Sequence, residues 1–116
     1  MSEADEQKAV IAYCDARNIT IFHIPNEAQR SPRTAAHLKA MGMRKGVPDL
    51  MMPIPRGKYH GLFIEMKVKP NKLSSEQFDW LLDLRRRGYA AFCCYGARHA
   101  IELIRRYEGL HDGEGL

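Results

Sequence analysis

Three charged residues of the chain have types and spacings that would let them act together. Glu65 and Lys67 are two positions apart, and Asp49 precedes Glu65 by sixteen residues. Side chains at positions i and i+2 of a strand lie on the same face of a sheet, so a strand over 61–68 would point Glu65 and Lys67 the same way. Asp49, at the start of a preceding strand, can join them. Two carboxylates and an ammonium in one place predict a divalent-metal site with a general base or charge stabiliser beside it.

The surroundings of these residues are strongly basic. Asp49 and Glu65 are the only acidic residues between positions 28 and 75, a stretch that also carries Arg30, Arg33, Lys39, Arg44, Lys45, Arg56, Lys58, Lys67, Lys69 and Lys72. Lysine and arginine neutralise phosphates without regard to sequence, so this stretch predicts a polyanionic partner such as nucleic acid. The alternative interpretation is a solvated basic face with no partner.

Composition places the chain among ordinary globular proteins. It has 116 residues, of which 45% are hydrophobic and 28% charged, with a net charge of +4. This length predicts a single domain with one buried core. No apolar run approaches the ~20 residues that cross a bilayer, and the acidic, polar start does not resemble a signal peptide. Three cysteines do not make a disulfide framework, so we expect reduced thiols, an intracellular, cytoplasmic protein and no membrane partner.

Periodicity and capping signals predict where the elements lie. Ser2 and Ser74 are candidate N-caps, with Gln77 completing a capping box after Ser74. Apolar spacing predicts helices over 3–17, 34–41, 74–87 and 97–107, and strands over 19–24, 50–52, 61–68 and 89–95. This order predicts an α/β fold in which helices flank a mixed central sheet. We expect one domain over residues 1–108 and a flexible tail over 109–116.

The motifs resemble a known nuclease family. Pro48-Asp49 followed by Glu65-Met66-Lys67 is the pattern of PD-(D/E)xK nucleases, and the chain as a whole is similar to small stand-alone VRR-NUC proteins of bacteria and phages. The match extends to Glu6-Gln7, Ile24-Pro25-Asn26-Glu27 with Arg30, Gly46-Val47-Pro48-Asp49-Leu50, Gly61-Leu62-Phe63-Ile64-Glu65-Met66-Lys67 and Ser74-Ser75-Glu76-Gln77. The resemblance implies a restriction-endonuclease-like fold and a metal-dependent endonuclease that hydrolyses DNA phosphodiesters. It further implies selectivity for branched DNA, such as four-way (Holliday) junctions, and a homodimer.

The resemblance also assigns roles to the central residues. Asp49 and Glu65 would bind Mg²⁺ or Mn²⁺, with the Met66 carbonyl oxygen as a third ligand and no organic cofactor. Lys67 would orient or deprotonate the attacking water, or stabilise charge developing on the phosphate. The structural alternatives are a turn aspartate after Pro48 at position 49, a solvent-facing strand glutamate at 65, and a salt bridge between Lys67 and Glu65 that takes no part in catalysis.

Two further residues of the predicted catalytic set have competing structural roles. Glu6 matches the acid that the family carries on its first helix, where it would bind a second metal or hold a metal-bound water; otherwise it is a charge that favours a helix N-terminus. Glu3 and Asp5 are rivals for the same role. Gln77 would lie near Lys67 and the scissile phosphate, or it would complete the capping box, and we expect that one amide cannot fully do both.

The remaining predictions concern DNA contacts and rival functions. The candidates for contacting DNA are Arg30, Arg33, Arg44, Lys45, Lys69 and Lys72. The five histidines do not cluster at metal-ligand spacing, and adjacent strand positions Cys93 and Cys94 point to opposite faces, so a zinc site is not expected. The rival hypotheses are a DNA-binding module of the same fold that does not cut, and a metal-sensing protein without a DNA partner.

Overall fold

The elements occur in the predicted order. The computed structural model describes residues 1–26 and 31–116. In chain order the elements are α1 (Glu3–Ala16), β1 (Phe22–His23), α2 (Pro32–Ala40), β2 (Leu50–Met52), β3 (Leu62–Lys67), α3 (Ser75–Arg86), β4 (Ala90–Tyr95) and α4 (Gly96–Glu108). The predicted α/β class, with a mixed sheet flanked by helices, is confirmed.

The sheet has four strands in the order β1-β2-β3-β4. Strands β1, β2 and β3 pair antiparallel, whereas β3 and β4 pair parallel. A parallel neighbour requires a crossover connection, and α3 supplies it. All six residues of β3 are buried, since β3 has a partner on each edge and helices on each face.

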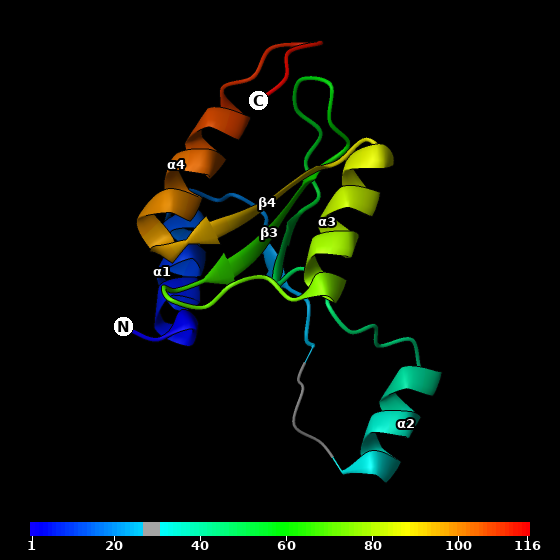
Figure 1. Ribbon diagram of the computed structural model, residues 1–116. Helices are drawn as coiled ribbons and strands as arrows, with labels where there is room; N and C mark the ends of the chain where they lie inside the picture. Colours follow the sequence, from blue (N-terminus) through cyan, green and yellow to red (C-terminus); the bar gives the residue numbers. More distant parts are fainter. Residues whose placement is uncertain (27–30) are drawn as a thin grey trace.

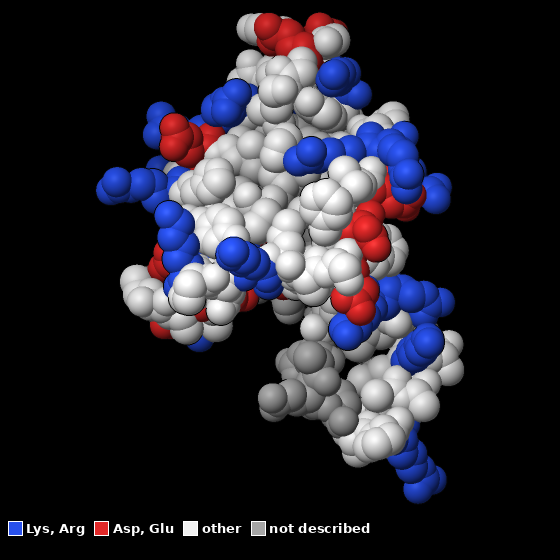
Figure 2. All heavy atoms as spheres, in the orientation of Figure 1, with Lys and Arg blue, Asp and Glu red and all other residues white. Residues whose placement is uncertain are grey.

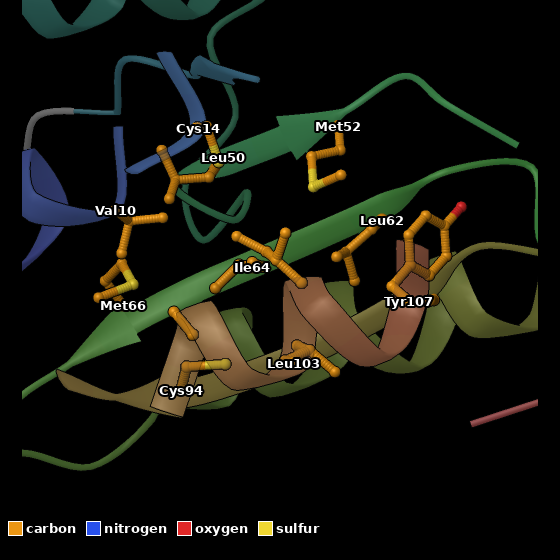
Figure 3. Close-up of a cluster of buried hydrophobic side chains, with 13 residues drawn as sticks. Val10, Cys14, Leu50, Met52, Leu62, Ile64, Met66, Cys94, Leu103 and Tyr107 are labelled. Atoms are coloured by element: carbon orange, nitrogen blue, oxygen red, sulfur yellow. The ribbon is translucent and has the colours of Figure 1, made fainter. Parts of the chain in front are cut away.

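Two apolar layers hold the helices to the sheet. Helices α1 and α4 cover one face, and α3 covers the other (Figure 1). The larger core lies under α1 and α4, where Val10 and Cys14 of α1 meet Ile64 and Met66 of β3 (Figure 3). The smaller core lies under α3, where Leu81 and Leu84 meet Phe63. The odd-numbered residues of β3, Glu65 and Lys67 included, therefore face α3.

Local capping signals account for the helix boundaries. Ser2 caps α1 in a capping box with Asp5, and Asn18 follows the helix with a φ of 56°, as its type favours. Helix α2 begins two residues before the predicted position 34, because Ser31 accepts the N–H of Thr34 and Pro32 occupies the first turn.

The face of α3 that meets the sheet differs from the prediction. The helical periodicity predicts a core-leaning face of Phe78, Leu81, Leu82 and Arg85, but the exposed fractions of Phe78 and Leu82 are 51% and 41%. Leu81 is buried as predicted, and Leu84 is buried with it. The helix carries two apolar stripes, and its rotation is set by where it meets Phe63. Strand β1 is also shorter than the predicted 19–24, because β2 offers it a partner only at Met51 and Leu50.

The C-terminal segment has defined partners. The carbonyl of Glu114 accepts the N–H of Lys58 at 2.9 Å, and the N–H of Leu116 donates to the hydroxyl of Tyr59 at 2.8 Å. The sequence did not predict these contacts, and the flexibility of residues 109–116 stays a prediction. Across residues 1–26 and 31–116, none of the helices has the length and apolar character needed to span a bilayer.

Truncating Ile64 and Phe78 would compare a buried core position of β3 with a half-exposed position of α3. Ile64→Ala removes a side chain that is 1% exposed at the centre of β3, so we expect the free energy of unfolding to fall by about 2–5 kcal/mol. Phe78→Ala removes a half-exposed side chain and should cost less than about 1.5 kcal/mol. Urea denaturation followed by circular dichroism measures both; equal losses would contradict the assigned face of α3.

Candidate active site

The antiparallel register of β2 and β3 brings the two predicted carboxylates together. Leu50 pairs with Ile64, so the same register carried one residue further sets Asp49 opposite Glu65. Side chains directly opposite each other on one face have Cβ atoms about 4.5–5.5 Å apart. Oδ2 of Asp49 accepts the backbone N–H of Met66 at 2.8 Å, which fixes its carboxylate beside β3.

Glu65 lies in a site that disfavours its charge. Its exposed fraction is 3%, and among the described residues no hydrogen-bond partner contacts its Oε1. Burial, followed by the negative charge of Asp49, raises the pKa of Glu65 to about 9. Without a cation, the neutral form of Glu65 is therefore favoured at neutral pH. A carboxyl held in this way is typical of a functional site rather than of a core chosen for stability.

Lys67 and Gln77 both approach the carboxyl group of Glu65. The Lys67 Nζ lies 3.9 Å from Oε2 of Glu65, a long ion pair, and Gln77 Nε2 donates to the same oxygen at 3.1 Å. Gln77 Oε1 meanwhile accepts the N–H of Ser74 at 2.9 Å, completing the capping box of α3. The expectation that one amide cannot serve both roles is wrong, because its oxygen accepts at the cap while its nitrogen donates to the site.

Of the acids of the first helix, Glu3 rather than Glu6 lies within electrostatic reach of the acidic pair. The negative charge of Glu3 adds to the causes that raise the pKa of Glu65, after burial and Asp49, so the two carboxyls are within electrostatic reach. Glu6 instead accepts the backbone N–H of Ala97 at 3.0 Å, at the start of α4. Residues four apart share a helix face, and Gln7 lies on the face of Glu3.

A close approach of backbone segments positions Asp49. Gly46 has a φ of +91°, and a Cβ there would lie 2.7 Å from the backbone carbon of Glu76 in the first turn of α3. Trp80 Nε1 donates to the carbonyl of Lys45 at 3.0 Å. The loop before β2 is thereby held against α3, and Asp49 and Gln77 approach Glu65 from two segments that contact each other.

Comparison with known proteins finds a matching family and a similar solved structure. The sequence matches the VRR-NUC domain over residues 1–98. A solved structure described as a VRR_NUC domain protein superposes with a TM-score of 0.84 at 29% identity, covering 100% of this chain and 97% of that one. The chain belongs to the VRR-NUC family. This family is part of the PD-(D/E)xK nuclease superfamily, so the chain is a nuclease-type DNA-processing module. No curated protein matches the sequence.

The donor set of this VRR-NUC site suits a hard divalent cation. Asp49 and Glu65 provide carboxylate oxygens on one face, and Oε1 of Glu65 is buried and unpartnered within the described part of the chain. Mg²⁺ and Mn²⁺ prefer oxygen ligands and keep several waters, so two carboxylates suffice for one ion. Within residues 1–26 and 31–116 there is no cluster of three or more histidine, cysteine or acidic side chains that would make a fuller protein cage.

The predicted DNA-contacting residues occupy different places in the VRR-NUC fold. Arg44, Lys45 and Lys72 line a cleft with a volume of about 690 Å³, into which Lys67 and Gln77 also reach. Arg33 and Lys69 are exposed and are not among the described residues that line this cleft. Arg30 lies outside the described residues, as does Glu27 of the same predicted loop.

Two residues near the site escaped the sequence analysis. His23 was read as ordinary, yet its Nδ1 lies 2.9 Å from the carbonyl oxygen of Asp49 and 3.2 Å from Gln7 Nε2. Only the pairing of β1 with β2 creates that contact, so no local signal reveals it. Lys39 was counted in the basic stretch but not among the DNA candidates, and it lines the cleft. Its position in the last turn of the predicted helix was the one sequence feature that could have marked Lys39 as a DNA candidate.

The pH dependence of stability would test the environment of Glu65. Its folded pKa is raised, so between about 4.5 and 9 the native state keeps a proton that the unfolded state releases, and stability falls as pH rises. Glu65→Gln keeps an acceptor for Gln77 and removes this dependence. In chelator at pH 8, we expect the free energy of unfolding of the variant to exceed that of wild type by at least about 2 kcal/mol. At pH 5 the difference should be much smaller. Equal pH slopes in urea denaturation would contradict the prediction.

Proposed function

We propose that this chain is a divalent-metal-dependent DNA endonuclease that hydrolyses phosphodiester bonds. The observation that carries the proposal is the opposition of Asp49 and Glu65 on one face of the sheet, with Lys67 beside Glu65 and lining a basic cleft. Folding alone does not favour two carboxylates set against each other when one of them is buried. A phosphodiester in contact with a cation and an ammonium gives the arrangement a use.

The residues divide the chemistry among them. Asp49, Glu65 and the Met66 carbonyl would hold Mg²⁺ or Mn²⁺, which when bound polarises a phosphate oxygen and lowers the pKa of a coordinated water. Lys67 is 9% exposed and held near Glu65, so its ammonium is placed to orient the attacking water or to offset charge that develops on the phosphate. Gln77 orients the Glu65 carboxyl through its amide nitrogen.

The first helix has a supporting role in this proposal. The charge of Glu3 helps to raise the pKa of Glu65, and Glu3 accepts the side-chain amide of Asn71 at 3.2 Å, which ties α1 to the segment after β3. Glu6 caps the start of α4 through Ala97. We therefore assign Glu3 in preference to Glu6 as the acid of the first helix that influences the metal site.

Branched DNA and a homodimer complete the proposal. Cutting a symmetric four-way junction requires two sites related by a two-fold axis, and this chain carries one. A homodimer of this small domain would present two such sites. Membership of the VRR-NUC family and the basic residues around the cleft support DNA as the substrate.

The decisive experiment compares cutting of a labelled four-way junction with cutting of a linear duplex of the same sequence, in Mg²⁺, in Mn²⁺ and in chelator. Asp49→Asn is the test variant, since it keeps an acceptor for the Met66 N–H but removes the negative charge. We expect metal-dependent cutting of the junction in preference to the duplex, and a loss of at least about a hundredfold in the variant. Asp83→Asn, which changes a half-buried carboxyl of α3 that is paired with Arg86, is the matched control.

The outcomes separate the two leading functions. Loss of cutting in Asp49→Asn alone supports the nuclease. Binding of DNA without cutting in either metal would overturn it in favour of a DNA-binding module of the same fold. Equal loss in Asp83→Asn would mean that the assay reports folding rather than the site, and circular dichroism of both variants identifies that case.

The two roles of Gln77 can be separated by substitution. Gln77→Glu keeps an acceptor for the Ser74 N–H, as glutamate does in a capping box, but cannot donate to Glu65. Ser74→Ala removes only the cap and should lower the free energy of unfolding by about 1 kcal/mol. We expect Gln77→Glu to impair cutting much more than Ser74→Ala while costing less stability. The reverse order in cleavage rates would contradict a role of Gln77 at the site.

A further inference from the structure

Helix α2 and the loop that follows it form an arm, residues 31–45, that stands away from the sheet (Figure 1). None of the nine residues of α2 is buried, although the structure describes all of them. The arm contains no acidic residue, and basic side chains lie along it (Figure 2). A helix that contributes nothing to the core and carries one sign of charge is suited to contact an anionic partner.

The cleft already described lies between this arm and the body of the molecule. Leu38 and Lys39 line it from the arm, and Lys67, Lys72 and Gln77 line it from the body. The cleft therefore has lysines both on the arm and on the body, and Lys67 of the proposed active site is one of the residues that line it. A partner lying in the cleft would reach that site directly.

The basic residues of the cleft differ in how free they are to bind a ligand. Arg44 donates to the carbonyls of Lys39 and Met43, so its guanidinium serves to close the end of α2. Lys45 is paired with Glu76 at 3.3 Å. Lys39 and Lys72 are exposed residues whose ammonium groups form no salt bridge within the described part of the chain. These two lysines are the best placed to contact phosphates.

The size and lining of the cleft indicate one strand rather than two. Its volume of about 690 Å³ falls in the range of pockets that enclose small molecules, roughly 300–1,000 Å³, which admits a short run of a single strand but not a double helix. Ala35, Leu38 and Met43 add apolar surface between the lysines. An unpaired strand exposes sugars and bases to such surface, whereas a duplex presents its phosphates outward.

We propose that the cleft between the arm and α3 holds an unpaired DNA strand, with Lys39 contacting its phosphates from the arm, Lys72 contacting them from the body, and the strand leading to Lys67. This inference rests on the proposed nuclease function and specifies how the substrate enters the same site. A flap or a fork offers such a strand directly, a four-way junction offers one where base pairs at its branch point open, and a blunt duplex offers none.

The test measures binding without cutting. Asp49→Asn protein in chelator is titrated into a fluorescent duplex that carries an unpaired oligothymidine tail, and into the same duplex without the tail, with anisotropy as the readout. Lys39→Ala and Lys72→Ala are each added to this background. Lys8→Ala removes an exposed lysine of α1 as the matched control.

We expect Lys39→Ala and Lys72→Ala each to raise the Kd for the tailed duplex by about fivefold and to reduce its salt slope by about one. Their effect on the blunt duplex should be smaller, and Lys8→Ala should change either Kd by less than about twofold. Equal effects on the two DNAs, or losses no greater than that of the control variant, would overturn the cleft assignment.

Parallel cleavage assays distinguish failure of the inference from failure of the proposed function. Wild-type protein that cuts branched DNA while the lysine variants bind normally would leave the nuclease intact and overturn only the cleft. If wild-type protein cuts no DNA and the Asp49→Asn protein binds none, the proposed function fails and the inference fails with it.

Discussion

The structure depends on the opposition of two carboxyl groups across an antiparallel strand pair. Like charges directly opposite each other destabilise a sheet, and burial of either charge adds to the cost. The fold offsets this conflict with a backbone N–H from Met66, an amide from Gln77 and an ammonium from Lys67. The conflict is not fully relieved, since the pKa of Glu65 remains raised, chiefly by burial and next by Asp49. A bound cation would remove both causes of strain at once.

Helix α3 joins this pair to the rest of the molecule. Its capping box aims Gln77 at Glu65, its first turn lies against Gly46, and Trp80 holds the carbonyl of Lys45. Helix α3 therefore contacts and positions both the base of the arm and the carboxylate pair. Because Leu81 and Leu84 anchor that helix on the sheet, the packing of the smaller core sets the geometry of the site.

Sequence alone gave the parts of the site that depend on local periodicity. The alternation over 61–68 and the capping pattern at Ser74 are short-range signals, and both strand β3 and the cap of α3 follow them. The rotation of α3 could not be obtained this way. The stripe through Phe78 and Leu82 and the stripe through Leu81 and Leu84 are both apolar, and only contact with β3 selects between them. The same holds for Glu6, whose partner Ala97 lies 91 residues away.

The two faces of the sheet divide stability from chemistry. Under α1 and α4, the even-numbered residues of β3 are apolar and join the larger core, which needs no ligand for its stability. Under α3, the odd-numbered residues change from Phe63 to Glu65 and Lys67 as the strand approaches its end, so the smaller core gives way to charge. A sheet that keeps its charged groups at one end of one face can bear an unfavourable carboxylate pair, because the opposite face is fully packed. The strain at Glu65 is therefore confined to the end of the sheet that opens toward the basic cleft, where a cation and a phosphate would relieve it.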